Sequence, residues 1–187
     1  MKIEDLVVEL SKDPFNPVLN FDVAVEYEKQ NQTASAVSFY LRTAEYGIES
    51  HPSFVYASLL KVAHCFDDQN DRNATVSNCL LQAVAFLPYR PEGYFLLAQF
   101  HERLGQWQEC YTWANIGLHN QFRIPLPVDV GYEGHYVLLF EKAVAAWWIG
   151  RKDESLQIFA RLNAMEIDPG YKKAVQNNLE RIGNASI

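Results

Sequence analysis

Small and turn-forming residues recur along the chain at a fixed distance, within stretches whose apolar positions follow a helical period. A small side chain inside a helix lets a second helix approach closely, and asparagine or glycine tolerates the left-handed backbone that ends a helix. Seven residues separate an alanine from such a turn residue at four places, Ala24 to Asn31, Ala63 to Asn70, Ala98 to Gly105 and Ala143 to Gly150. Another small residue follows five positions later, namely Ala36, Thr75, Cys110 and Ser155. The pattern predicts a repeated unit of helix, tight turn and helix.

The breaks between these units fall near prolines. Pro17, Pro52 and Pro91 stand where the first helix of a unit should begin. At this position the N–H group that proline lacks would have no partner within the helix. Four hairpins are predicted, over about residues 17–47, 52–87, 91–118 and 134–165. Amphipathic segments at residues 2–11 and about 170–183 are expected to cap the two ends. The predicted fold class is all-α, a right-handed α-α superhelix forming a single repeat domain over residues 1–187.

One long connection has no helical period. It spans Asn120–Glu133 and contains Pro125 and Pro127. Long segments without secondary structure are commonly functional or disordered. Its apolar side chains favour a segment that folds back on the protein, and we expect it to cover the end of a groove near Trp147. These side chains are Phe122, Ile124, Leu126 and Tyr132.

With these positions in view, about residues 17–165 resemble the tetratricopeptide repeat family. The second hairpin is the most degenerate, because the positions of its second helix drift from the pattern. The matching positions are Ala24, Tyr27, Ala36 and Tyr40 in the first hairpin, Tyr94, Leu97, Ala98, Gly105, Trp107, Cys110 and Ala114 in the third, and Leu139, Ala143, Gly150, Ser155 and Phe159 in the fourth. The resemblance implies that the first helices of successive hairpins line a concave groove that binds a protein or peptide segment.

Helical period then predicts which side chains face that groove, counted from the small residue of each first helix. The candidates are Phe21, Val25, Glu28 and Lys29 in the first hairpin, Leu60, His64, Asp67 and Asp68 in the second, Phe95, Gln99, Glu102 and Arg103 in the third, and Phe140, Val144, Trp147 and Trp148 in the fourth. Exposed aromatic side chains beside polar groups are typical of a peptide-binding hot spot. Two alternatives stay open: the aromatic residues pack inside the protein, and the aspartates form a solvated helix end rather than a clamp for a basic peptide.

A narrower resemblance covers roughly residues 88–182. The run RPEGYFLLAQFHERLGQWQECYTWANIGL, followed by IPLP and the fourth hairpin, is similar to the helical repeat segment that accompanies glycosyltransferase domains in some large bacterial and viral proteins. In those proteins the sugar chemistry resides in a separate α/β domain. The resemblance implies an accessory role in glycan assembly, with a glycosyltransferase as partner, as the alternative to peptide binding. A purely structural, self-associating role is the third possibility.

Composition and charge narrow the class of partner. The 187 residues are 49% hydrophobic and 13% aromatic, which is too apolar for a disordered chain. The net charge of −7 argues against a nucleic acid or an anionic membrane as the main partner. Residues 1–100 hold 13 acidic and 7 basic residues, so a basic partner would be attracted most strongly there.

The chain lacks the sequence signals of an enzyme. It has no Asp-x-Asp element, no glycine-rich nucleotide loop and no nucleophile elbow, and no Cys/His cluster has the spacing of a metal site. The three cysteines, Cys65, Cys79 and Cys110, are expected to be reduced thiols of a cytoplasmic protein. The acidic N-terminus does not favour a signal peptide, and the apolar stretch Val137–Ile149 is too short to span a bilayer. We therefore expect no catalytic residues, cofactor or metal.

Overall fold

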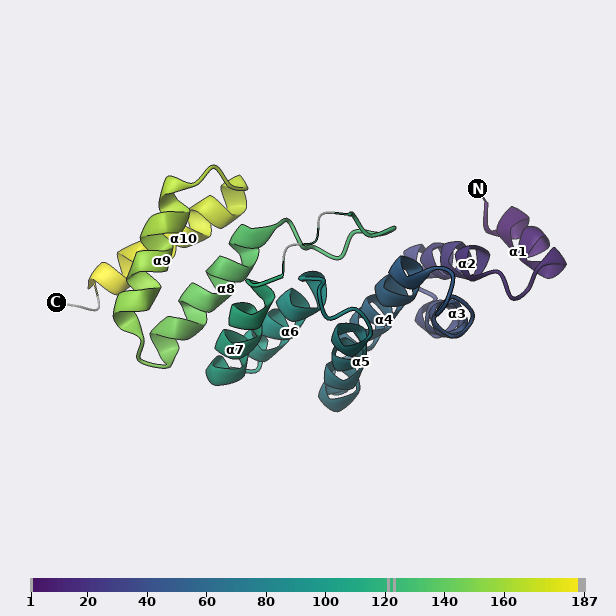
Figure 1. Cartoon of the computed structure of the whole chain (residues 1–187), viewed down its shortest axis with the longest axis horizontal. Coiled ribbons are helices and arrows are strands. Elements are labelled where there is room, and N and C mark those ends of the chain that lie inside the picture. The colour runs from purple at the N-terminus through teal and green to yellow at the C-terminus, as the bar shows by residue number, and fades with distance from the viewer. Residues whose placement is uncertain (1, 121, 123, 185–187) are drawn as a thin grey trace. The chain divides into compact units, whose positions relative to one another are not determined.

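The computed structural model describes residues 2–120, 122 and 124–184, and the regular structure of this part of the chain is entirely helical (Figure 1). The helices are α1 (Ile3–Lys12), α2 (Pro17–Lys29), α3 (Thr33–Tyr46), α4 (Pro52–Asp67), α5 (Asn73–Phe86), α6 (Glu92–Arg103), α7 (Trp107–Gly117), α8 (His135–Trp148), α9 (Lys152–Ala164) and α10 (Pro169–Asn184). The pairs α2–α3, α4–α5, α6–α7 and α8–α9 are the four predicted hairpins. Helices α1 and α10 are the predicted terminal helices.

The turns of the hairpins have the backbone conformation that the sequence predicts. Asn31, Asn70, Gly105 and Gly150 all have positive φ, between 57° and 85°. The alanine seven residues before each of them is at most 1% exposed, which confirms its role at the contact between helices. The hairpin geometry therefore follows from a small residue at the contact and a left-handed residue at the turn.

The second hairpin departs from this register by one residue. Thr75 was expected at the buried position of the second helix, but it is half-buried, and Val76 is buried in its place. The cause is an extra left-handed residue in the turn, because Asp71 has φ 55° directly after Asn70. The assignment of Thr75 is wrong, and the turn of this hairpin is one residue longer than the others.

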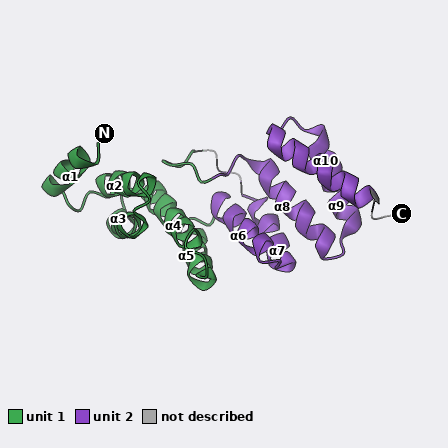
Figure 2. Ribbon diagram, turned by 180° about the vertical axis from the view of Figure 1, so that it is seen from behind, with its two compact units in different colours: residues 1–88, 123–130 green, residues 89–122, 131–187 purple. Residues whose placement is uncertain are grey.

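The helices gather into two compact units (Figure 2). The first unit comprises Met1–Pro88 and Arg123–Val130, and thus α1 to α5. The second unit comprises Tyr89–Phe122 and Gly131–Ile187, and thus α6 to α10. Each unit has a hydrophobic core of its own, while the single repeat domain expected over residues 1–187 stays a prediction.

The connection between α7 and α8 contributes to both units, and its predicted position is wrong. Leu126 and Val128 pack against the core of the first unit, around Phe21 and Ala57, rather than beside Trp147. The residues at its two ends stay with the second unit, where the Phe122 ring lies 5.1 Å from Tyr89 and the Tyr132 ring 5.7 Å from Phe95. Leu126 and Val128 thus fold back onto a core distant in sequence, whereas Ile124 is 64% exposed and does not fold back as expected.

The core of the second unit holds α8 between two layers of helices. Ala98, Cys110 and Leu138 form one buried cluster, and Leu139, Phe159 and Val175 belong to another. The hydroxyl of Ser155 donates a 2.7 Å hydrogen bond to the carbonyl of Ala143, which ties α9 to α8. These contacts fix α8 with one side turned toward α10. Among the described helices, none combines the length and the apolar character needed to cross a membrane.

Candidate functional site: a pocket over α8

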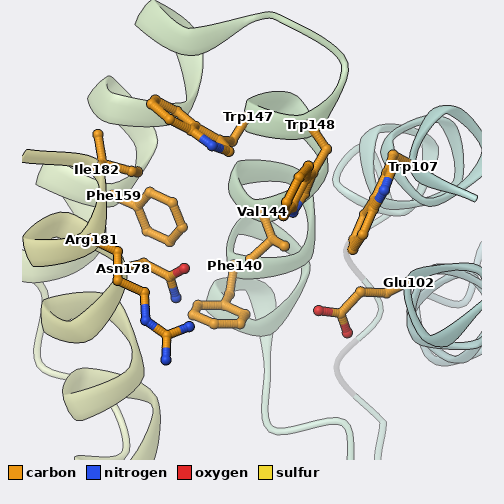
Figure 3. Close-up of a pocket in the computed structure, with 10 residues that line it drawn as sticks. All are labelled: Glu102, Trp107, Phe140, Val144, Trp147, Trp148, Phe159, Asn178, Arg181 and Ile182. Atoms are coloured by element: carbon orange, nitrogen blue, oxygen red, sulfur yellow. The ribbon is translucent and has the colours of Figure 1, made fainter. Parts of the chain in front are cut away.

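The second unit contains a pocket of about 440 Å³ whose floor is α8 (Figure 3). Helix α10 forms one wall, and α6 with the beginning of α7 forms the other. The lining residues are Phe140, Val144, Trp147 and Trp148 of α8, Phe159 of α9, Asn178, Arg181 and Ile182 of α10, Glu102 of α6 and Trp107 of α7. Phe140, Val144 and Trp147 share a side of α8 because residues four and three apart lie one above the other on a helix.

The two adjacent tryptophans of α8 have different roles. Trp147 is half-buried, and the Lys152 ammonium nitrogen lies 4.9 Å from the centroid of its ring. Trp148 is 61% exposed, and its indole stacks on that of Trp107 with centroids 5.2 Å apart and planes 15° from parallel. The stack gives the most exposed tryptophan a defined orientation at the rim of the pocket (Figure 3).

The floor of the pocket is held by edge-to-face aromatic contacts. The Phe140 ring lies 6.0 Å from Phe159 and 5.4 Å from Tyr171, with interplanar angles of 76° and 84°. This is a favoured geometry for aromatic pairs, since the positive edge of one ring meets the negative face of the other. The aromatic floor is therefore fixed by α9 and α10 rather than free to collapse.

Polar groups stand on the two walls. Arg181 is exposed on α10, and Asn178 beside it donates a 2.9 Å hydrogen bond from Nδ2 to the carbonyl of Ala174. On the opposite wall, the half-buried Glu102 turns its carboxyl group into the pocket (Figure 3). The pocket thus presents an acidic group on α6 and a basic group on α10, with apolar surface between them.

Glu102 is hydrogen-bonded to a second carboxyl group behind it, that of Glu141. Glu141 is 2% exposed, receives a hydrogen bond from Gln99, and its Oε2 has no hydrogen-bond partner among the described residues. Burial, and then the neighbouring charge of Glu102, raise the pKa of Glu141 to about 8. Burial raises the pKa of Glu102 as well. At neutral pH the pair therefore holds one proton, on Glu141, which donates to the Glu102 carboxylate.

The pocket brings together five of the residues expected from the sequence: Glu102, Phe140, Val144, Trp147 and Trp148. Gln99 lies behind them as a donor to Glu141. Phe95 was also expected in the groove, and this is wrong because it is 1% exposed in the core of the second unit. The same expectation is wrong for Phe21 and Leu60 of the first unit, which are 2% and 1% exposed. Helix α6 packs against both α7 and α8, which encloses the side of the helix that carries Phe95.

The other expected residues lie outside the pocket. Arg103 is exposed, with its guanidinium carbon 5.6 Å from the centroid of the Phe100 ring. His64, Asp67 and Asp68 stand on α4 of the first unit, where His64 Nε2 lies 3.7 Å from Asp68 Oδ2. A binding role for these three residues stays a prediction.

Five lining residues were missed in the sequence: Trp107, Phe159, Asn178, Arg181 and Ile182. Three of them belong to α10, which was treated only as a cap although it also supplies a pocket wall. A signal was available, because Asn178, Arg181 and Ile182 have the three- and four-residue spacing of one helix side. In the described part of the chain, no three His, Cys, Asp or Glu side chains gather closely enough to hold a metal ion.

Comparison with known proteins finds solved structures of similar fold. No family model matches the sequence, and no curated protein matches it either. A tetratricopeptide repeat protein from Parabacteroides merdae has a TM-score of 0.70 at 14% identity, over 97% of this chain and 66% of its own. YrrB, described as a tetratricopeptide repeat protein with an unusual peptide-binding site, has a TM-score of 0.66 at 14% identity, over 96% and 86%. MamA has a TM-score of 0.65 at 13% identity, over 86% and 84%. The predicted superhelical hairpin fold of the tetratricopeptide repeat type is confirmed.

Proposed function

We propose that the second unit binds a peptide segment of a partner protein in the pocket over α8, without catalysing a reaction. The observation that carries the proposal is Trp148, a largely exposed indole held by its stack on Trp107 at the rim of the pocket. The side chains that line this pocket offer apolar surface with one acidic and one basic group, rather than a nucleophile beside a base.

The physical case rests on preorganisation. A large aromatic side chain buries much area in a complex, and it loses little entropy when its orientation is already fixed. The stack on Trp107 fixes Trp148, and the edge contacts of Phe140 fix the floor. A volume of about 440 Å³ is within the range of sites that take a few side chains of a ligand. YrrB, which shares the fold, is itself described as having a peptide-binding site.

The finer alternatives have less support. The accessory role beside a glycosyltransferase rests on the sequence resemblance over residues 88–182, and no observation of the described residues favours it. The identity of the partner, and a location in the cytoplasm, likewise stay predictions.

Peptide selection on the intact chain tests the proposal. Random peptides blocked at both ends are selected on the immobilised protein, and the enriched peptides are then titrated while tryptophan fluorescence is followed. Three of the four tryptophans line the pocket, so binding there should give a saturable change. Trp148→Ala should weaken binding by about tenfold or more, equivalent to about 1.4 kcal/mol.

Phe15→Ala is the matched control, because Phe15 is an exposed aromatic residue of the first unit. It should leave the affinity unchanged. Enriched peptides that bind wild type and the Trp148→Ala variant equally well would place binding outside the pocket. Failure to enrich any peptide would reject the proposal.

A further inference from the structure

The acidic side chain on the pocket wall has an equivalent in the first unit. Glu28 and Glu102 occupy the same position of their repeats, four residues after the small alanine of a first helix. In the first unit the Tyr40 hydroxyl donates a 2.6 Å hydrogen bond to Glu28 Oε2, and the Lys61 ammonium group forms an ion pair with Oε1. Glu28 is thus compensated by both a neutral donor and a cation of its own unit.

The same positions in the second unit carry neither a hydroxyl group nor a cation. The place of Lys61, two residues before the small alanine of the next hairpin, is taken by Glu141. The place of Tyr40, four residues after the small residue of the second helix, is taken by Ala114. Glu102 therefore meets a second carboxyl group where its counterpart meets an ammonium group, and it lines a pocket as well. The arrangement has a cation position that no residue in the described part of the chain fills.

We propose that the pocket takes a lysine side chain of the partner peptide, whose ammonium group binds Glu102 as Lys61 binds Glu28. This inference rests on the proposed function and specifies the chemistry of its ligand. The aliphatic stem of the lysine lies along the apolar floor at Phe140 and Val144, toward which Glu102 is turned (Figure 3). A long apolar stem with a charged end suits a site that is apolar below and acidic at one wall.

The other titratable groups around the carboxyl pair do not supply the missing cation. Lys142 of α8 is engaged with Glu154 at 2.9 Å. Cys110 of α7 and Tyr171 of α10 are neutral, since burial raises the pKa of both, that of Tyr171 to about 12. Arg181 of α10 is exposed on the opposite wall, where water and salt screen its charge. A ligand cation at Glu102 therefore gains an acidic partner that no internal cation neutralises.

The carboxyl pair also gives the interaction a pH dependence. An ammonium group at Glu102 favours ionisation of the neighbouring Glu141, so binding is linked to partial release of the proton that Glu141 holds at neutral pH. Burial and the charge of Glu102 raise the pKa of Glu141 to about 8, so less proton has to be expelled as the pH rises. The affinity for a lysine peptide should therefore increase between about pH 6 and about pH 8, below the pH at which the lysine itself loses its charge.

The test compares two pools of blocked pentapeptides that differ at one atom group. One pool has a central lysine and the other has norleucine, which keeps the four-carbon stem and lacks the ammonium group. Each flanking position is an equal mixture of alanine, leucine, phenylalanine and serine. Binding to the intact chain is measured by tryptophan fluorescence. The lysine pool should bind at least about tenfold more tightly than the norleucine pool.

Glu102→Gln should remove that preference by weakening only the lysine pool, whereas Glu180→Gln, the same charge change outside the pocket, should preserve it. Glu141→Lys places a cation where Lys61 stands in the first unit, and it should abolish the preference while the norleucine pool still binds. If either Glu102→Gln or Glu141→Lys alters the fold, the other variant still tests the inference.

Each contrary outcome has its own meaning. Equal binding of the two pools, or a preference that survives in Glu102→Gln, overturns the inference and leaves peptide binding in the pocket standing. Cadaverine binding as tightly as the lysine pool shows a site for free amines and overturns the peptide as occupant. Self-association of wild type that Trp148→Ala abolishes makes a second copy the occupant, which also overturns it. Failure of the random-peptide selection would instead reject the proposed function itself.

Discussion

The two units use the same repeat position in opposite ways. In the first, Glu28 is neutralised by Lys61 and hydrogen-bonded to Tyr40, and Leu126 and Val128 of the connection cover part of the core. In the second, Glu102 is left beside another carboxyl group at the wall of an aromatic pocket. Under the proposed binding role, a repeat satisfies this polar position either with its own side chains, as in the first unit, or with those of a ligand, as in the second.

The second unit also contains a polar network of this kind, at Glu154 rather than at Glu102. The Tyr111 hydroxyl donates to Glu154 at 2.9 Å, and Lys142 forms an ion pair with the same carboxylate. Burial alone would raise the pKa of Glu154, but the hydrogen bonds from Lys142 and Tyr111 lower it overall. These contacts join α7, α8 and α9, so a glutamate without a cation, as at Glu102, is a local feature of the pocket.

Loss of the cation in the first unit should have the largest effect on stability. Lys61→Met leaves Glu28 without its cation at a site where the two side chains are only 12% and 24% exposed. We expect the free energy of unfolding to fall by about 3 kcal/mol, the lower end of the cost of breaking a buried pair. Urea unfolding measures this loss. Lys12→Met, at an exposed pair with Glu9, should change it by less than about 0.5 kcal/mol.

Overpacking a hairpin contact should come next. Ala98 is fully buried between α6 and its neighbours, so Ala98→Leu should lower the free energy of unfolding by about 2 kcal/mol. The equivalent change in the first unit, Ala24→Leu, should cost a similar amount. A melting temperature unchanged in both variants would show that the repeat register is wrong in both units.

Removal of the second carboxyl group should stabilise the second unit, in contrast to the loss of Lys61 in the first. The pKa of Glu141 is raised in the folded state by burial and by Glu102, so its contribution to stability is present at low pH and is lost as the pH rises toward about 8. Glu141→Gln should remove this loss, with stability near wild type at about pH 4.5 and higher than wild type by at least about 1 kcal/mol at about pH 8.5. Unfolding curves across this range provide the measurement. A wild-type stability that rises over the same interval would contradict the raised pKa.

The turns offer the smallest effect. The first unit uses asparagine at positive φ and the second uses glycine, with no atom near the position of an added Cβ at Gly105. Gly105→Val should therefore cost only the backbone strain, about 1 kcal/mol, whereas Asn31→Gly should change stability by a few tenths of a kcal/mol. Thermal unfolding of both variants compares the turns, and equal losses would argue against strain as the cause.

Local pattern was enough to predict the hairpins from the sequence, because each depends on one small residue and one left-handed residue close together. It failed at Thr75, where the second left-handed residue, Asp71, has no signature that separates it from an ordinary turn residue. It also failed for the connection, since Leu126 and Val128 find their partners far away along the chain. Contacts of that kind are set by tertiary packing and not by period.

Half of the pocket could be predicted for the same reason. Four residues of α8 follow from the period of one helix, and Glu102 follows from the period of another; the four are Phe140, Val144, Trp147 and Trp148. The α10 wall could not be predicted in this way, because it depends on how the terminal helix packs against α8. The carboxyl pair required knowing that α6 and α8 lie side by side, so that Glu102 meets Glu141 where the first unit has Lys61.

Hydrogen exchange of the intact chain, with and without a peptide enriched by selection, tests most directly whether the second unit is the binding unit. We predict slower amide exchange in α6, α8 and α10 on peptide binding, and unchanged exchange in α2 and α4, where the equivalent glutamate is already neutralised. Protection of α2 and α4, with α8 and α10 unaffected, would contradict the assignment of binding to the pocket over α8.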